Sequence, residues 1–185
     1  MTEVLYPRRQ TREVKVGSVI IGGNNPIVIQ SMTATKTQDI EATAAQVNQL
    51  EKAGAGLVRI AVDSIADAKA LAEIRARTSA NLSVDLQENW DNLVESVAPF
   101  VQEIRYNPGH LYHHERSKPV LDKVALIADI ADKYNCALRA GVNCGSVDPE
   151  LATKFGADSV TAMVESGLMH ADMLNNKLGF KRFNA

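Results

Sequence analysis

Three features that many functional classes need are scarce in this sequence: cysteine, excess basic charge and long apolar runs. Its 185 residues include two cysteines, Cys136 and Cys144, which form no CxxC pair, so we expect neither a structural zinc nor a redox dithiol. The formal net charge of -2 leaves no basic excess for nucleic acid or a membrane surface. No apolar run approaches the roughly 20 residues of a membrane helix, and the N-terminal segment lacks the apolar stretch of a secretory signal. The sequence therefore predicts a cytoplasmic protein.

Glycine-rich phosphate loops are absent as well. The chain contains neither a GxGxxG motif nor a P-loop, and Gly22 and Gly23 precede the first expected strand instead of following it. The sequence gives no sign of either nucleotide-binding loop.

What is present is a repeated unit, in which a short apolar or β-branched run is followed by a polar turn and a helical period. Helices are expected to start after Asp39, Ser64 and Pro119, and a last one spans about 159–179 with Gly179 as its C-cap. This alternation predicts right-handed βαβ units and a parallel sheet. The expected strands are residues 26–33, 56–63, 82–88, 101–108 and 136–143.

Two segments lie outside these units. Residues 14–21 alternate apolar and polar side chains around a Gly-Ser pair, which predicts a β-hairpin that covers one end of the sheet. Residues 180–185 look like the opening of a sixth strand. Because a (β/α)₈ barrel typically needs about 250 residues, we expect residues 1–185 to form an incomplete N-terminal TIM-barrel domain, with about five of the eight units present. The chain is then a piece of a larger protein.

Polar residues recur at the ends of the expected strands. Arg105 and Asn107 are two positions apart and Arg139 and Asn143 four apart, so each pair points to one face of its strand. Arg59 has a comparable place in the second strand. Ligands of parallel α/β folds bind beyond the carboxyl ends of the strands, and a planar, permanently charged guanidinium suits phosphate. We therefore expect a site for a phosphorylated small molecule, which Gln30, Ser31, Thr33, Asp63, Asp85 and Gln87 also border.

Each of these residues also has an ordinary interpretation. A single arginine in a strand is commonly an ion-pair residue and Asn-Pro-Gly is commonly a turn, but three arginines at comparable positions favour the anion site. Asp85 has three open roles, as an acid, an arginine partner or a hydroxyl acceptor. The segment 110–115, HLYHHE, has no standard metal-ligand spacing, so no metal site is expected there.

Several segments, in order, resemble the 4-hydroxy-3-methylbut-2-enyl diphosphate synthase family, iron–sulfur enzymes of the methylerythritol phosphate route to isoprenoids. RRQTREVKVGSVIIGG resembles the family's opening, and PIVIQSMTATKTQDIEATAAQVNQLEKAGAGLVRIAV resembles its first two barrel units. RYNPG and RAGVNCGS resemble the family's RINPGN and RIGVNAGS segments. The resemblance covers almost the whole chain, and several motifs in order make it specific.

The resemblance implies an oxidoreductase that opens 2-C-methyl-D-erythritol 2,4-cyclodiphosphate reductively, removing a hydroxyl with two electrons from a [4Fe-4S] cluster. It implies that Arg59, Arg105 and Arg139 neutralise the diphosphate and that Asp85 faces the carbon skeleton. The other substrate contacts that it implies are Asn107, Asn143, Gln30, Ser31, Thr33 and Ser146.

The same resemblance places the chemistry outside this chain. The family's cluster ligands, three cysteines and a glutamate, lie in a separate C-terminal domain beyond the position of Ala185. The catalytic glutamate also lies beyond this position. Neither Cys136 nor Cys144 matches a cluster ligand. No catalytic residue and no metal ligand is implied here, and the chain alone is expected to be inactive. The complete enzyme is expected to take electrons from flavodoxin or ferredoxin and to be a homodimer.

Two positions depart from the family pattern. Gln87 stands where the family has histidine, and His110 where it commonly has asparagine, so the role of that histidine is not carried over.

Two other functions stay open. A pteridine-binding synthase on a related barrel also acts on a diphosphate-bearing substrate, although its characteristic sequences differ from QSMT and VNCGS. A non-catalytic half-barrel would instead bind a partner, or complete another barrel, through its open strand edges.

Overall fold

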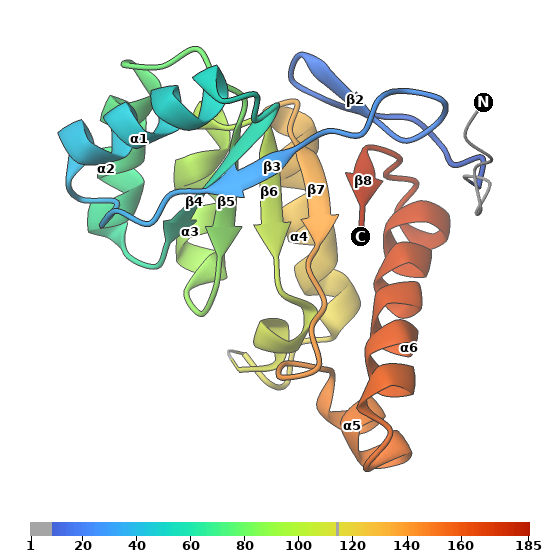
Figure 1. Ribbon diagram of the computed structural model, residues 1–185. Coiled ribbons are helices and arrows are strands. Elements are labelled where there is room, and N and C mark those ends of the chain that lie inside the picture. Colours follow the sequence, from blue (N-terminus) through green and yellow to red (C-terminus); the bar gives the residue numbers. More distant parts are fainter. Residues whose placement is uncertain (1–8, 114) are drawn as a thin grey trace.

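A parallel sheet is the centre of the computed structural model, which describes residues 9–113 and 115–185. Its six strands follow one another in chain order and each pairs with the next. The parallel α/β class is confirmed, and so is the sixth strand near the end of the sequence. As Figure 1 shows, the strands are β3 (Gln30–Met32), β4 (Leu57–Val62), β5 (Leu82–Leu86), β6 (Glu103–Tyr106), β7 (Ala137–Ala140) and β8 (Phe183–Asn184).

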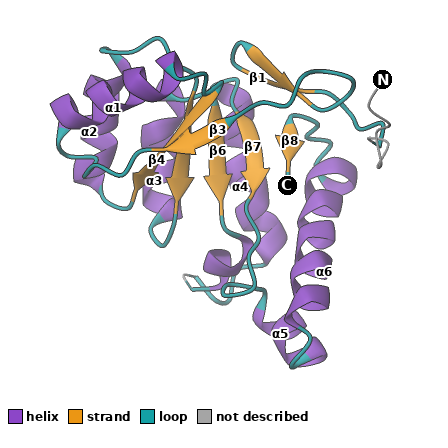
Figure 2. Ribbon diagram, viewed as in Figure 1, coloured by secondary structure: helices purple, strands orange, loops and turns teal. Residues whose placement is uncertain are grey.

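Helices connect the strands and pack against the sheet (Figure 2). None of the described helices combines the length and the apolarity that a bilayer span requires. The α-helices are α1 (Ile40–Lys52), α2 (Ile65–Arg75), α3 (Trp90–Val97), α4 (Val120–Lys133), α5 (Pro149–Phe155) and α6 (Ser159–Asp172). Two 3₁₀ turns, η1 (Ala98–Phe100) and η2 (Pro108–Tyr112), and a π-helical turn, η3 (Met173–Lys177), complete the list.

The predicted helix starts are confirmed. The Asp39 side chain accepts the Ala42 N–H at 3.1 Å, and Ser64 Oγ accepts the Asp67 N–H at 3.2 Å, so a side chain satisfies one backbone donor at each of these two helix starts. Pro119 directly precedes α4.

Other boundaries differ from the predictions. The short helices α3 and α5 and the turn η2 were not predicted. Strand β3 begins at Gln30, four residues later than expected. The last helix ends as an α-helix at Asp172 and continues as η3, after which Gly179 turns the chain with a φ of +68°.

Alternation along the strands separates an apolar face from a polar one. Residues such as Val58, Ile60 and Val84 are fully buried and belong to the core between sheet and helices. The opposite face of the same strands carries Arg59 and Asp85, one residue out of phase with these apolar positions. The folding free energy comes mainly from the helix side, which leaves the other face available for polar chemistry.

The predicted hairpin is confirmed, and it covers one end of the sheet. Strands β1 (Val14–Val16) and β2 (Val19–Ile21) pair antiparallel, and Val14 and Val16 pack with Leu57 and Ala137 in a second apolar cluster. Leu57 and Ala137 open β4 and β7, so the hairpin lies over the N-terminal ends of the strands (Figure 1). The C-terminal ends stay free of it.

A buried polar contact links α6 to the sheet. His170 is fully buried, and its Nδ1 lies 3.1 Å from the hydroxyl of Tyr106 on β6. Burial lowers the pKa of His170 from 6.5 to about 4 and raises the pKa of Tyr106, so both groups are neutral at pH 7.

Helix α6 also exposes an apolar stripe. Val160, Val164 and Leu168 are 65%, 49% and 59% exposed and lie four residues apart, on one face of the helix. Within the described residues, β3 and β8 each pair with one strand only. Both edges of the sheet and this helix face therefore remain open.

The buried histidine predicts a pH-dependent stability. Because the folded pKa of about 4 is below the unfolded value of 6.5, the unfolded chain binds more protons between these two pH values. The stabilisation is present above pH 6.5 and is lost as the pH falls towards 4, with about 2 kcal/mol lost between pH 7 and pH 5. Urea unfolding at both pH values measures it.

The variant His170→Leu should lose most of this difference, whereas a control, His113→Gln, at a half-exposed histidine, should keep it. Equal losses of stability in His170→Leu and the unmodified chain would exclude His170 as the cause.

Candidate functional site

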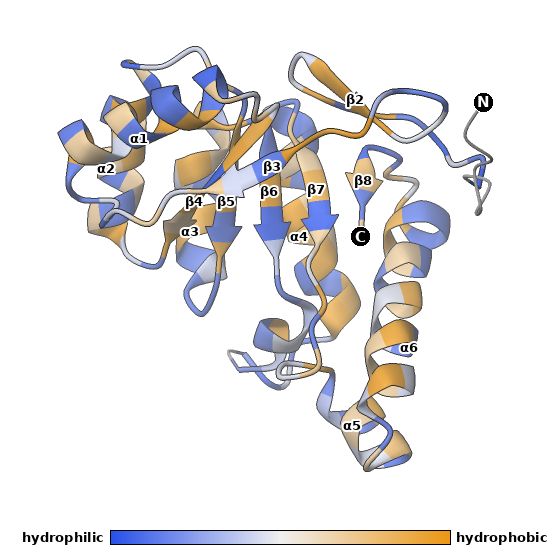
Figure 3. Ribbon diagram, viewed as in Figure 1, coloured by the Kyte–Doolittle hydropathy of each residue, from blue (hydrophilic) through white to orange (hydrophobic). Residues whose placement is uncertain are grey.

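Four polar residues form a row across the polar face of the sheet. Strand pairing places Asp85 of β5 beside Arg105 of β6, Arg105 beside Arg139 of β7, and Arg139 beside Asn184 of β8. We call these four residues the charged row. Figure 3 shows that the C-terminal ends of β5, β6 and β7 are hydrophilic, at the end of the sheet opposite to the hairpin. Of the three arginines predicted at comparable positions, Arg105 and Arg139 are level in the register, and Arg59 is one step closer to the hairpin, opposite Ser83.

Asp85 holds two of the arginines. Its Oδ1 accepts a hydrogen bond from Arg105 Nη1 at 2.6 Å, and its Oδ2 lies 3.7 Å from Arg59 Nε. The side chains of Asp85 and Arg105 are 7% and 12% exposed. Of the three roles left open for Asp85, the structure shows the arginine partner. One carboxylate facing two guanidiniums leaves positive charge uncompensated on this face.

A glycine makes room for the Arg105 guanidinium. Arg105 Nη2 donates to the carbonyl oxygen of Gly141 at 2.7 Å, where β7 ends. A Cβ atom on Gly141 would clash with Arg105 Nε and lie 2.6 Å from its Cζ. The guanidinium therefore has a fixed plane, set by Asp85 on one side and by the Gly141 backbone on the other.

Arg139 is held across the concave face of the sheet. Its Nη1 donates to Gln30 Oε1, although β3 and β7 are not neighbours in the sheet. The contact is made because the sheet curves, as in a barrel. A cleft of about 390 Å³ opens at this point, and Gln30, Leu57, Arg139 and Asn184 are among its lining residues. A cleft of this size is sufficient for a small-molecule ligand.

Two loops beyond the sheet are joined by an amide–hydroxyl cluster. Asn107 Nδ2 donates to Ser146 Oγ at 2.6 Å, and Ser146 Oγ donates to Asn143 Oδ1 at 3.0 Å. Gly109 packs so closely on the Ser146 backbone that an added Cβ would clash with the carbonyl group. The three predicted residues Asn107, Asn143 and Ser146 therefore lie together at the carboxyl ends of β6 and β7.

Two predicted residues do not lie on the polar face. Ser31 pairs in register with Val58, a core residue, and so lies on the helix side of β3. Thr33 is buried and donates its backbone N–H to the Arg59 carbonyl at 3.0 Å.

A second row of residues, one step closer to the hairpin, was not predicted from the sequence. Arg59, Ser83, Glu103 and Ala137 are neighbours in register on the polar face, and we call them the lower row. Glu103 is 0% exposed, and its oxygens accept from Ser83 and Asn184. Alternation along the strand could have revealed this row. Ser83 and Glu103 stand two residues before Asp85 and Arg105, and residues two apart in a strand share a face.

The histidine segment lies against the carboxylate of Glu88. Glu88 lies 2.7 Å from His113 Nδ1 and 3.7 Å from His110 Nε2, and the two imidazole rings stack with centroids 5.3 Å apart. His110 Nε2 also lies 3.3 Å from Asn107 Nδ2. His114 is outside the described residues. In the ranges 9–113 and 115–185, no three His, Cys, Asp or Glu side chains are grouped to hold a metal ion.

Comparison with known proteins now decides the family. Residues 11–185 match the model of the GcpE TIM-barrel domain. The chain belongs to this family. It is 56% identical over 177 residues to "4-hydroxy-3-methylbut-2-en-1-yl diphosphate synthase (flavodoxin)" of Rhodopirellula baltica, covering 95% of this chain and 46% of the relative. It is 41% identical over 169 residues to the protein of that name from Exiguobacterium sibiricum, covering 91% of this chain and 44% of the relative. The chain spans about half the length of these relatives.

The cysteines of this chain do not fit an iron–sulfur cluster. Cys136 is fully buried, with its Sγ 3.3 Å from the carbonyl oxygens of Ala98 and Val101, and burial raises the pKa of its thiol to about 11. A cluster ligand must be a thiolate, so Cys136 is a core residue. Cys144 is exposed on the loop of Asn143 and Ser146 and has no second thiol beside it. We assign no redox step to this chain.

The Gly141 contact predicts a stability effect. Gly141→Ala should force Arg105 away from Asp85 and reduce the free energy of unfolding by about 1–3 kcal/mol. Gly145→Ala is the matched control, because its Cβ would lie 3.4 Å from Asn143 Oδ1, its one close contact. Urea denaturation compares the two variants. Equal free energies of unfolding in the two variants would contradict this prediction, because Arg105 would then move aside without a loss of stability.

Proposed function

We propose that this chain is the substrate-binding part of a 4-hydroxy-3-methylbut-2-en-1-yl diphosphate synthase and that it binds the diphosphate of 2-C-methyl-D-erythritol 2,4-cyclodiphosphate. The observation that carries the proposal is the charged row, where Arg105 and Arg139 are adjacent and Asp85 joins Arg59 to them. Guanidinium groups bind phosphate oxygens in pairs of charge-assisted hydrogen bonds. The names of the relatives, which specify the synthesis of a diphosphate, support a diphosphate ligand.

Each residue then has a role that its position supports. Arg59, Arg105 and Arg139 neutralise the diphosphate, and Gln30 positions Arg139 through its side-chain oxygen. The cluster of Asn107, Asn143 and Ser146 hydrogen-bonds the ligand from the loop side. Asp85 orients two guanidiniums and faces the carbon skeleton. We leave Ser31 and Thr33 outside this set, since Ser31 lies on the helix side of β3 and Thr33 is buried.

The reduction itself belongs to the rest of the protein. We propose that the complete protein carries a [4Fe-4S] cluster on ligands outside this chain, accepts electrons from a flavodoxin and acts as a cytoplasmic homodimer. The donor is taken from the names of the relatives. The family match over residues 11–185 leaves the pteridine-binding alternative without support.

We also propose that further units of the same barrel cover the open edges. The stripe of Val160, Val164 and Leu168 has the spacing of a helix-packing surface, and β3 and β8 each have one pairing side left in the described part of the chain. The relatives contain as much sequence again as this chain matches.

Sequencing the coding DNA past the codon of Ala185 tests this domain arrangement. The frame should continue through about three more βα units, the first of them begun by β8, and then encode a cysteine-bearing domain. A stop codon directly after Ala185 would contradict it and would favour the non-catalytic half-barrel.

Calorimetric titration with the cyclodiphosphate tests the binding site. Arg139→Met removes one charge-assisted phosphate contact worth about 1.5–3 kcal/mol, so the affinity should fall roughly 10- to 100-fold. The control is Arg77→Met, at an exposed arginine that pairs with Glu41 and Glu73 on the helix side. Equal affinities of the two variants would contradict the proposed role of the charged row.

A further inference from the structure

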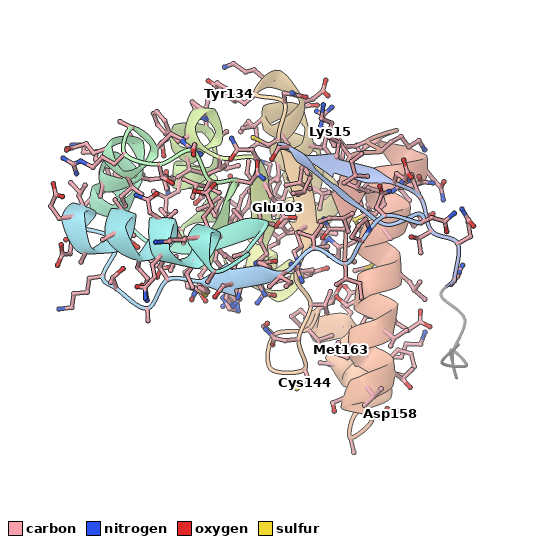
Figure 4. The ribbon with its side chains drawn as sticks, turned by 45° about the horizontal axis from the view of Figure 1, so that its top comes forward. Lys15, Glu103, Tyr134, Cys144, Asp158 and Met163 are labelled. Atoms are coloured by element: carbon pink, nitrogen blue, oxygen red, sulfur yellow. The ribbon has the colours of Figure 1, made fainter. Side chains whose placement is uncertain are left out.

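The lower row contains a buried carboxylate to which the proposed function gives no role. Glu103 is the first residue of β6 and is 0% exposed. Its Oε1 accepts from Ser83 Oγ at 2.8 Å, and its Oε2 accepts from Asn184 Nδ2 at 3.1 Å. Both oxygens are acceptors, as they are in an ionised carboxylate. Figure 4 labels Glu103 among the strands, away from the loop that carries Cys144.

The charges nearest to Glu103 along the sheet are arginines. Arg105 is two residues further along the same strand, roughly 7 Å away on the same face. Arg59 is in the lower row itself, with Ser83 between them. Among the described residues no cationic group forms an ion pair with Glu103, so its charge acts on the guanidiniums from a distance.

The two hydrogen bonds of Glu103 do not by themselves explain why a charged side chain is buried at this position. Taking a carboxylate out of water is unfavourable, and two neutral donors offset that only in part. A glutamine would have the same shape and an oxygen for one of the same donors, without the penalty of a buried charge. What the carboxylate of Glu103 adds, compared with a glutamine, is a negative charge that lowers the positive potential around the arginines of the polar face.

We propose that Glu103 sets the charge selectivity of the anion site. Its carboxylate, together with Asp85, opposes the three guanidiniums, so the polar face keeps a small positive excess. Small multivalent anions such as inorganic pyrophosphate are then bound weakly, because they have no carbon skeleton to make contacts beyond those of the phosphate groups. A diphosphate attached to a hydroxylated carbon skeleton gains further contacts with Asp85 and the loop amides. This inference rests on the proposed function, since it requires an anion on the arginines.

Removing the charge should strengthen the binding of simple anions. In the 185-residue chain, Glu103→Gln should raise the affinity for inorganic pyrophosphate about tenfold, as expected for one charge removed at this range in a partly buried site. The gain for inorganic monophosphate should be smaller, because the ligand carries less charge. Calorimetric titration of both anions measures the ratio. A purely structural role would lower both affinities or leave them unchanged.

Three further variants complete the test. Glu103→Asp keeps the charge and should keep the selectivity, and Ser83→Ala removes a hydrogen bond without changing the charge and should give no gain. Glu103→Met removes the charge with an apolar side chain of similar length, and it replaces the glutamine variant if that does not show a cooperative thermal transition.

The outcomes separate the two proposals. If the unmodified chain binds pyrophosphate and neither neutral variant binds it more tightly, the inference about Glu103 is wrong and the proposed function stands. If no form binds pyrophosphate or the cyclodiphosphate, the proposed function fails and this inference fails with it.

Discussion

The ion pair between Asp85 and Arg105 is the interaction on which the polar face of this sheet depends. Three guanidiniums on one face of the sheet, from β4, β6 and β7, repel one another, and a buried arginine without a partner would be costly. Asp85 contacts two of them at 2.6 and 3.7 Å, and Gln30 holds the third from across the curve of the sheet. The arginines are thus oriented before a ligand arrives, so little side-chain entropy has to be lost on binding.

The rest of the fold supplies the conditions for this arrangement. Helices bury the apolar face of β4 to β8, which leaves the other face polar, and the hairpin seals the end of the sheet where Leu57 and Ala137 lie. Small residues matter at two points: Gly141 makes room for the Arg105 guanidinium, and Gly109 lets the loops that carry Asn107 and Ser146 meet. Function and core therefore occupy opposite faces of the same strands.

The sequence was sufficient to predict the order of the strands, the hairpin and the shared face of the three arginines. These features depend on the alternation of side chains along a strand and on helix caps, which are local signals. What could not be predicted depends on contacts far apart in sequence. The bond from Gln30 to Arg139 needs the curvature of five strands, and Glu103 meets Asn184 only when β8 is in register with β7. Alternation also puts Glu103 on the polar face and Ser31 on the other one, but the predicted site omitted Glu103 and included Ser31. The short helices α3 and α5 have too few residues for a clear helical period.

The most direct test of the charged row as a diphosphate site is an NMR titration that follows the side-chain Nε–H signals of arginine. Arg59 Nε and Arg105 Nε are buried and make no hydrogen bond within the described residues. Adding 2-C-methyl-D-erythritol 2,4-cyclodiphosphate should shift the signals of Arg59, Arg105 and Arg139 together, at one saturating concentration, and leave that of the exposed Arg77 in place. Shifts confined to surface arginines, or none at all, would contradict the account.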